Sequence, residues 1–181
     1  YPFFRSLLFR LEPETAHHLT LQALRLAGNF PLSNWFLRQL YKVPQKTVQA
    51  FGLTFKNPVG LAAGYDKDAL AIRGLSALGF GHLEVGTVTL KPQPGNPAPR
   101  IFRLPQDEAV INRMGFPGNG ADYVAASLRG MLVPEVISSS KGLLPRFAGR
   151  NDIVLGVNLG KNKDTPLEEA ANDYLALMRI F

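Results

Sequence analysis

Cysteine is absent from the 181 residues of this chain. Without cysteine the chain cannot form a disulfide scaffold, a thiolate zinc site, an iron–sulfur cluster or a cysteine nucleophile. It also lacks an apolar run of the roughly 18 residues that a membrane-spanning helix needs. Its 14 prolines and 17 glycines follow no short period, which excludes collagen and simple low-complexity sequence. With 46% hydrophobic and 19% charged residues, the chain can bury a hydrophobic core. Its length corresponds to about one domain.

Positive charge is concentrated at the start of the chain. The net charge is +6, and residues 1–50 carry six basic against two acidic residues. These basic residues stand singly between Leu, Phe and Trp rather than in clusters. Nucleic acid binds clustered basic surface, so it is not expected as a partner, and the interleaving favours a membrane surface instead. A solvated helix face is the plain structural alternative.

Two helices are predicted near the N-terminus. Apolar residues recur at helical spacing over residues 16–27 and again over residues 32–41. Both helices are apolar around much of their circumference, so they must pack on the body, on a partner or at a bilayer interface. We therefore expect a helical extension over residues 1–42 and a separate body over residues 43–181.

The body is predicted to consist of strand–loop–helix units. Apolar runs predict strands at residues 58–63, 82–89 and 152–159, each followed by a helix, at 66–78, 120–132 and 167–181. Shorter extended segments are predicted at residues 48–55, 100–104 and 109–112. Such units imply parallel strands joined by crossover helices. A (β/α)8 barrel needs roughly 250 residues, so only its first part fits here, and a small doubly wound sheet is the competing architecture.

Two common ligand-binding patterns are incomplete. The run from Gly156 to Asn162 resembles a phosphate-binding loop, but it has three residues between its glycines where four are needed, and Asn162 stands where Ser or Thr would hold magnesium. Adjacent His17 and His18 point about 100° apart on a helix, so they do not form a metal pair. No metal site is expected.

Small and polar residues lie at the ends of the predicted strands. Ala63–Lys67 follow the first strand, Thr87 lies near the end of the second, and Asn158 near the end of the third. Parallel α/β proteins carry their chemistry at the carboxyl ends of strands. Small residues let a flat ligand lie against the backbone, Lys67 offers a cation to an anion, and an amide can pair with the ring edge of a flavin or pyrimidine. Each residue alone is better explained by a structural role, because caps and turns use the same residue types, but three such sites at neighbouring strand ends favour a ligand.

Long stretches of the chain resemble the class 2, quinone-dependent dihydroorotate dehydrogenases. They are FGLTFKNPVGLAAGYDKD (51–68), LGFGHLEVGTVTLKPQPGNPAPRIFRLPQDEAVINRMGF (78–116) and LGVNLGKNKDTPLEEAANDY (155–174). LEPETAHHLT (11–20) is similar to the helical extension that separates this class from the soluble class. The resemblance implies an α/β fold, the N-terminal part of a (β/α)8 TIM barrel preceded by a small helical segment that associates with a membrane.

The resemblance also implies an activity and its residues. The family oxidises dihydroorotate to orotate with FMN, in pyrimidine (UMP) biosynthesis, and passes the electrons to a membrane quinone. The implied flavin-lining residues are Ala63, Gly64, Tyr65, Asp66, Lys67, Thr87 and Asn158. The implied substrate-binding residues are Lys67, Asn112, Arg113, Met114, Gly115 and Phe116. The residues implied near the quinone tunnel are His17 and Arg103.

The chain departs from the family pattern in three respects. Tyr65 stands where Leu or Phe is common, and Pro117 stands where Asn is common. Pro117 removes a backbone donor beside the substrate loop. The segment that supplies the family's serine base is expected after Phe181, and Ser138–Ser140 match nothing catalytic, so no catalytic residue is assigned. We expect an N-terminal half that is inactive alone.

The expected location is the periphery of a membrane. It would be the cytoplasmic face of a bacterial cell membrane, or the mitochondrial inner membrane in a eukaryote. Two other functions stay open. One is a noncatalytic fragment that binds a membrane or a partner through residues 1–41, and the other is an FMN barrel oxidoreductase with a different substrate.

Overall fold

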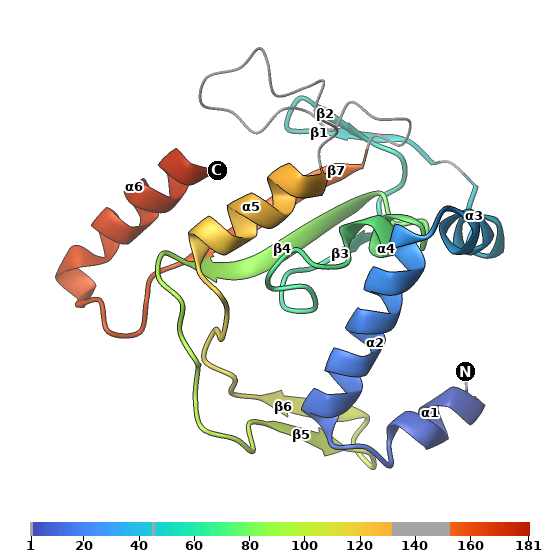
Figure 1. Cartoon of the computed structure of the whole chain (residues 1–181), viewed down its shortest axis with the longest axis horizontal. Helices are drawn as coiled ribbons and strands as arrows, with labels where there is room; N and C mark the ends of the chain where they lie inside the picture. The colour runs from blue at the N-terminus through green and yellow to red at the C-terminus, as the bar shows by residue number, and fades with distance from the viewer. Residues whose placement is uncertain (1, 45, 132–152) are drawn as a thin grey trace.

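The computed structural model describes residues 2–44, 46–131 and 153–181, and its centre is a three-stranded parallel sheet (Figure 1). The strands lie in the order β3 (Gly60–Leu61), β4 (His82–Thr89) and β7 (Val154–Gly160). Along the chain they are followed by α4 (Ile72–Ser76), α5 (Ala121–Met131) and α6 (Ala170–Ile180), with the 3-10 helix η2 (Leu167–Glu169) before α6. The predicted parallel strand–helix units are confirmed, as expected for part of a barrel. Residue 152 of the third predicted strand and Ser138–Ser140 lie outside the described residues.

Side chains on one face of β4 form part of the hydrophobic core. Leu83, Val85 and Val88 are buried, and they pack with apolar residues of α4, α5 and α6. An irregularity in the pairing with β7 lies between Val85 and Val88, which keeps both valines on the helix side. Since successive side chains of a strand point to opposite faces, Glu84 and Thr87 lie on the other face of the sheet.

The first helix of the body is much shorter than the predicted helix over residues 66–78. The side chain of Asp66 accepts hydrogen bonds from the backbone amides of Leu70 (2.8 Å) and Ala71 (2.8 Å). These bonds hold the chain in a turn, and Ala69 has a φ of 57°, outside the helical region. The helical spacing of apolar residues therefore predicted the wrong first residue for this helix. The Asp66 side chain binds the backbone amides there, and the spacing does not reveal such a bond.

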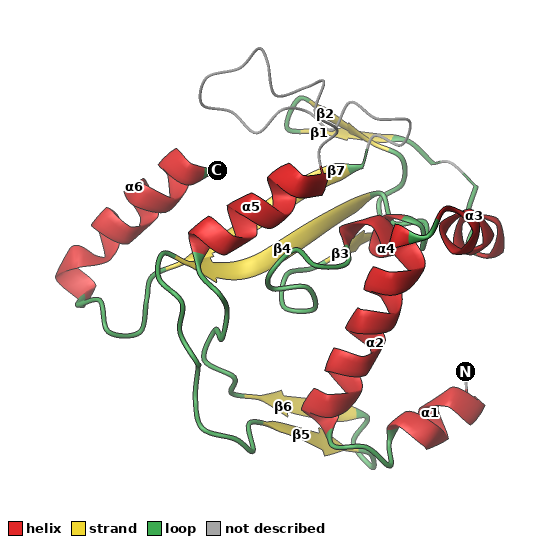
Figure 2. Cartoon of the chain, viewed as in Figure 1, coloured by secondary structure: helices red, strands yellow, loops and turns green. Residues whose placement is uncertain are grey.

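Two antiparallel hairpins flank the sheet, at the predicted extended segments. They are β1 (Val48–Ala50) with β2 (Leu53–Phe55), and β5 (Ile101–Leu104) with β6 (Ala109–Asn112). Phe51 and Gly52 both have positive φ, as a two-residue hairpin turn of this kind requires. The β5–β6 hairpin is set apart from the parallel sheet and lies beside the start of α2 (Figure 2).

The N-terminal region forms α1 (Pro2–Leu8), α2 (Pro13–Asn29) and α3 (Pro31–Leu40). Glu12 caps α2, since its side chain accepts the Thr15 amide at 2.9 Å. Figure 1 shows α2 running from the β5–β6 hairpin to α4, and it buries Ala16, Leu21 and Gly28. α3 buries no residue, and no helix of the described part of the chain is both long and apolar enough to cross a bilayer. The boundary at residue 42 stays a prediction.

Contact between α2 and α4 depends on two glycines. A Cβ on Gly74 would lie 2.1 Å from the Leu24 carbonyl oxygen, and a Cβ on Gly28 would lie 2.3 Å from the Gly74 nitrogen. We expect Gly74→Ala to lower the free energy of unfolding of the complete protein by about 1–3 kcal/mol in urea denaturation, because backbone atoms cannot rotate away.

The control for this prediction is Gly130→Ala on α5, where an added Cβ meets nothing within 4 Å. That change should leave stability equal or raise it by up to about 1 kcal/mol, since alanine favours the helix. Equal stability of the Gly74→Ala and Gly130→Ala proteins would contradict the close packing of α2 on α4.

Candidate functional site

A chain of hydrogen bonds links the three parallel strands, from Asn158 on β7 across β4 to the loop after β3. Thr87 donates its hydroxyl to Asn158 Oδ1 at 2.6 Å, and Asn158 Nδ2 donates to Glu84 Oε1 at 3.1 Å. Glu84 Oε2 accepts the backbone amide of Ala63 at 3.3 Å. The structure therefore brings together predicted flavin-lining residues from all three strand ends. Glu84 was missed, although an acid inside a predicted buried strand was a signal for it.

Gly64 offers open backbone at the end of β3. Its φ is +111°, a conformation that glycine adopts readily, and no atom lies within 4 Å of where a Cβ would stand. Its amide donates to the Gly86 carbonyl oxygen at 2.8 Å, which ties the loop to β4. A flat ligand can approach the backbone here.

Asp66 is turned into the protein. It is fully buried, and both carboxylate oxygens accept the backbone amides that precede α4. Burial raises the pKa of this carboxyl, while its hydrogen bonds with the Ala71 and Leu70 amides oppose that shift. Its side chain serves the turn, so a ligand contact at Asp66 would involve the backbone.

Lys67 lines a cavity of about 240 Å³ together with residues of α2 and with Met114 of the predicted substrate loop, residues 112–116. Its Nζ donates to the sulfur of buried Met114 at 3.1 Å. Burial is the largest cause lowering the pKa of Lys67, and nearby Glu14 raises it. Two residues predicted to bind substrate, 47 positions apart, thus meet at this cavity.

The other residues of the predicted substrate loop make different contacts. The Asn112 side chain accepts the Met114 amide at 2.9 Å, so it shapes its own loop. Arg113 lies over the Phe102 ring and donates to the Pro99 carbonyl oxygen at 3.1 Å. The carbonyl oxygens of Gly115 and Phe116 both accept the Gln93 side-chain amide, at 3.1 Å each, and the Phe116 ring is exposed.

His17 connects α2 to the loop after β3. Its Nε2 donates to the Tyr65 carbonyl oxygen at 2.6 Å, since a carbonyl only accepts. Nδ1 is then an acceptor, buried without a partner among the described residues. Burial is the largest cause lowering the pKa of His17, which favours the neutral ring. The Tyr65 hydroxyl donates to Thr20 at 2.9 Å, so this departure from the family pattern adds a second link to α2.

Arg103 lines a different cavity, of about 280 Å³, between α1 and the β5–β6 hairpin. Its guanidinium lies 4.6 Å from the centre of the Phe9 ring, and it donates to the Leu11 carbonyl oxygen at 2.8 Å. Arg5 also lies over Phe9, at 4.9 Å. The two residues predicted near the quinone tunnel, His17 and Arg103, are therefore not brought into one cavity.

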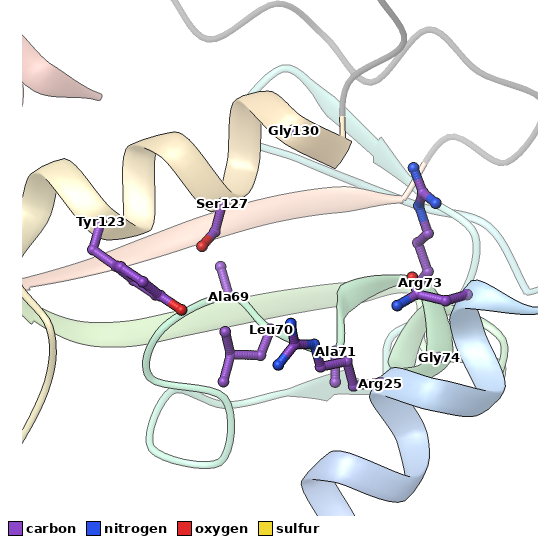
Figure 3. A pocket seen from close by; sticks show the side chains of 10 residues that line it. Arg25, Ala69, Leu70, Ala71, Arg73, Gly74, Tyr123, Ser127 and Gly130 are labelled. Atoms are coloured by element: carbon purple, nitrogen blue, oxygen red, sulfur yellow. The ribbon is translucent and has the colours of Figure 1, made fainter.

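A further hollow of about 210 Å³ lies between α2, α4 and α5. Figure 3 shows Arg25, Tyr123 and Ser127 around it, with Tyr123 and Ser127 reaching from α5. It contains no predicted site residue. Within residues 2–44, 46–131 and 153–181, no three His, Asp or Glu side chains gather to hold a metal ion.

The family model for dihydroorotate dehydrogenase matches residues 45–181. This chain belongs to the dihydroorotate dehydrogenase family. A relative from Burkholderia cenocepacia, named dihydroorotate dehydrogenase (quinone), is 50% identical over the whole chain, which covers 47% of that relative. A relative of the same name from Acidithiobacillus ferrooxidans is 50% identical over 99% of the chain and 46% of its own length.

Solved structures of dihydroorotate dehydrogenase from Eimeria tenella resemble the chain in fold. The complex with ferulenol has a TM-score of 0.69 and 40% identity, covering 92% of this chain and 41% of that one. The ligand-free form has a TM-score of 0.59 and 40% identity, covering 86% and 41%. The mixed α/β fold is thus that of part of a dihydroorotate dehydrogenase barrel. The chain spans about half the length of the curated relatives it matches.

One ion pair of this chain could not be predicted from its sequence. Glu14 on α2 and Arg100 before β5, 86 positions apart, form an ion pair in which Arg100 Nε donates to Glu14 Oε2 at 3.0 Å. Arg100 lowers the pKa of Glu14, and Glu14 raises that of Arg100. A first-turn glutamate is common in helices, so no local pattern distinguished Glu14.

Proposed function

We propose that the complete protein containing this chain is a quinone-dependent dihydroorotate dehydrogenase. It oxidises dihydroorotate to orotate with FMN, passes the electrons to a membrane quinone and serves pyrimidine biosynthesis. The name of the relatives at 50% identity supports this reading. The observation that carries it is the contact of Lys67 with Met114, where a cation at a strand end meets the predicted substrate loop.

The strand ends fit a flavin. Gly64 leaves open space beside its backbone, and the Thr87 and Asn158 side chains lie at the neighbouring strand ends. Ala63, Gly64 and Tyr65 would bound the ring system, while Thr87 and Asn158 would offer polar groups to its edge. FMN, when bound, supplies the two-electron oxidation that turns dihydroorotate into orotate.

Lys67 suits an anionic substrate. Its side chain is half-buried, and among the described residues its hydrogen-bond partner is a neutral sulfur. A half-buried cation gains from a nearby negative charge, and dihydroorotate carries a carboxylate. Lys67 would therefore bind and orient the substrate against the flavin. We assign no catalytic base within residues 1–181.

The exposed surface of α3 supports peripheral attachment to a membrane. Leu32, Trp35, Phe36 and Leu40 are between 58% and 78% exposed, and Arg38 lies on the same helix. Apolar and aromatic side chains with arginine suit the interface of an anionic bilayer. A quinone dissolved in the bilayer would reach such a docked enzyme.

The proposal is tested on the complete purified protein. It should be yellow, with a flavin spectrum, and anaerobic dihydroorotate should bleach the flavin while orotate forms in equal amount. Absence of flavin would favour the noncatalytic membrane- or partner-binding reading. Flavin that dihydroorotate does not reduce would indicate an FMN oxidoreductase with another substrate.

A further inference from the structure

The Glu14–Arg100 ion pair forms one wall of the cavity that contains Lys67 and Met114. Both side chains of the pair are 15% exposed. Arg100 Nε and Nη2 both donate to the Glu14 carboxylate, so the fork of the guanidinium meets both carboxylate oxygens. Paired geometry of this kind, shielded from water, fixes the direction of the guanidinium.

The third guanidinium nitrogen of Arg100, Nη1, binds the backbone of residues 94–96. Nη1 donates to the carbonyl oxygens of Pro94 at 2.7 Å and Asn96 at 2.9 Å. The backbone carbonyl oxygen of Arg100 accepts the Arg113 amide at 2.9 Å. One arginine, oriented from α2, therefore binds residues 94–96 and the start of the substrate loop.

Asn96 extends this network to the substrate loop. Its amide donates to the Met114 carbonyl oxygen at 2.8 Å, and its side chain donates to the Arg113 carbonyl oxygen at 2.7 Å. Met114 in turn contacts Lys67. The contacts thus run without a break from Glu14 on α2 to the predicted substrate cation.

We propose that Glu14 is a positioning residue for dihydroorotate binding, acting through Arg100 on the loop that holds Met114 against Lys67. This inference rests on the proposed function. It makes α2, the helix that also carries His17, a part of the substrate site. Glutamine in place of Glu14 keeps the shape, but it offers one acceptor oxygen and turns an amide donor toward the guanidinium. Arg100 then loses the partner that aims it at the loop.

The experiment compares Glu14→Gln with Glu12→Gln in the complete enzyme. Like Glu14, Glu12 lies at the start of α2, but its side chain caps the helix by accepting hydrogen bonds from Thr15, and among the described residues it makes no hydrogen bond with the loop. Anaerobic flavin reduction gives the dissociation constant of dihydroorotate. We expect Glu14→Gln to raise it by about tenfold, as losing a charged hydrogen bond would, and Glu12→Gln to change it by less than about twofold. The KM for quinone should stay within about twofold in both.

A second measurement needs no substrate. Hydrogen exchange of the Asn96 and Arg113 amides, whose bonds tie the loop together, should be faster in Glu14→Gln than in Glu12→Gln. The positioning role is wrong if both variants weaken the binding of dihydroorotate equally. It is also wrong if Glu14→Gln leaves both the affinity for dihydroorotate and the hydrogen exchange of these amides unchanged. If the unmodified enzyme is not reduced by dihydroorotate, the proposed function fails instead, and the exchange result still decides whether Glu14 orders the loop.

Discussion

Replacing Lys67 by alanine in the complete enzyme should slow flavin reduction by dihydroorotate by about 10- to 100-fold, the effect of losing one charge-assisted contact. The lysine stands where the loop after β3 meets Met114, and burial already makes its charge costly without an anion. If Lys67 binds the substrate as proposed, removing the ammonium would leave the substrate carboxylate without that partner. Anaerobic stopped-flow measurement of flavin bleaching gives the rate directly.

Two variants control the Lys67 experiment. Lys46→Ala removes an exposed lysine outside the cavity and should leave the rate unchanged. Lys67→Arg keeps the charge in a larger group and should retain more activity than alanine. An unchanged rate in Lys67→Ala, at full flavin occupancy, would show that this lysine does not bind the substrate.

Replacing Trp35 and Phe36 together by serine should weaken binding to vesicles of anionic phospholipid by about 100-fold, since each aromatic ring loses its burial in the interface. Both rings are exposed on α3, which buries no residue, so the fold should survive. Co-sedimentation with vesicles measures the loss. Flavin reduction by dihydroorotate should continue at its normal rate, while reduction of long-tailed quinones should fall.

The matched control is Leu167→Ser, which removes an exposed apolar side chain on η2. It should bind vesicles normally. Unaltered vesicle binding by the double variant would mean that the apolar face of α3 does not dock on a bilayer. Deletion of residues 1–41 is a poorer test, because it also removes Leu21 and Gly28 and uncovers α4.

Local pattern was sufficient to predict the strand–helix units and the extended segments at residues 48–55, 100–104 and 109–112, but their antiparallel pairing into hairpins came from the structure. Apolar residues alternate with other residues or follow one another along β4, which has eight residues, and β7, which has seven. A pattern of that length can be read from the sequence alone. The same reasoning failed at residues 66–71, where the Asp66 side chain binds the amides that a helix would have used. A side chain that competes with the backbone leaves the apolar spacing unchanged, so periodicity does not detect it.

The sequence by itself therefore determined the parallel order of the units, the small residues after β3 and the place of Lys67 at a strand end. Resemblance to a family then implied which residues bind flavin and substrate. Only the tertiary structure paired Glu14 with Arg100, Tyr65 with Thr20 and Glu84 with Asn158, across 45 to 86 positions of chain. Such pairs depend on how helices and loops approach one another, as at the Gly28–Gly74 contact, and short-range periodicity carries no information about that approach.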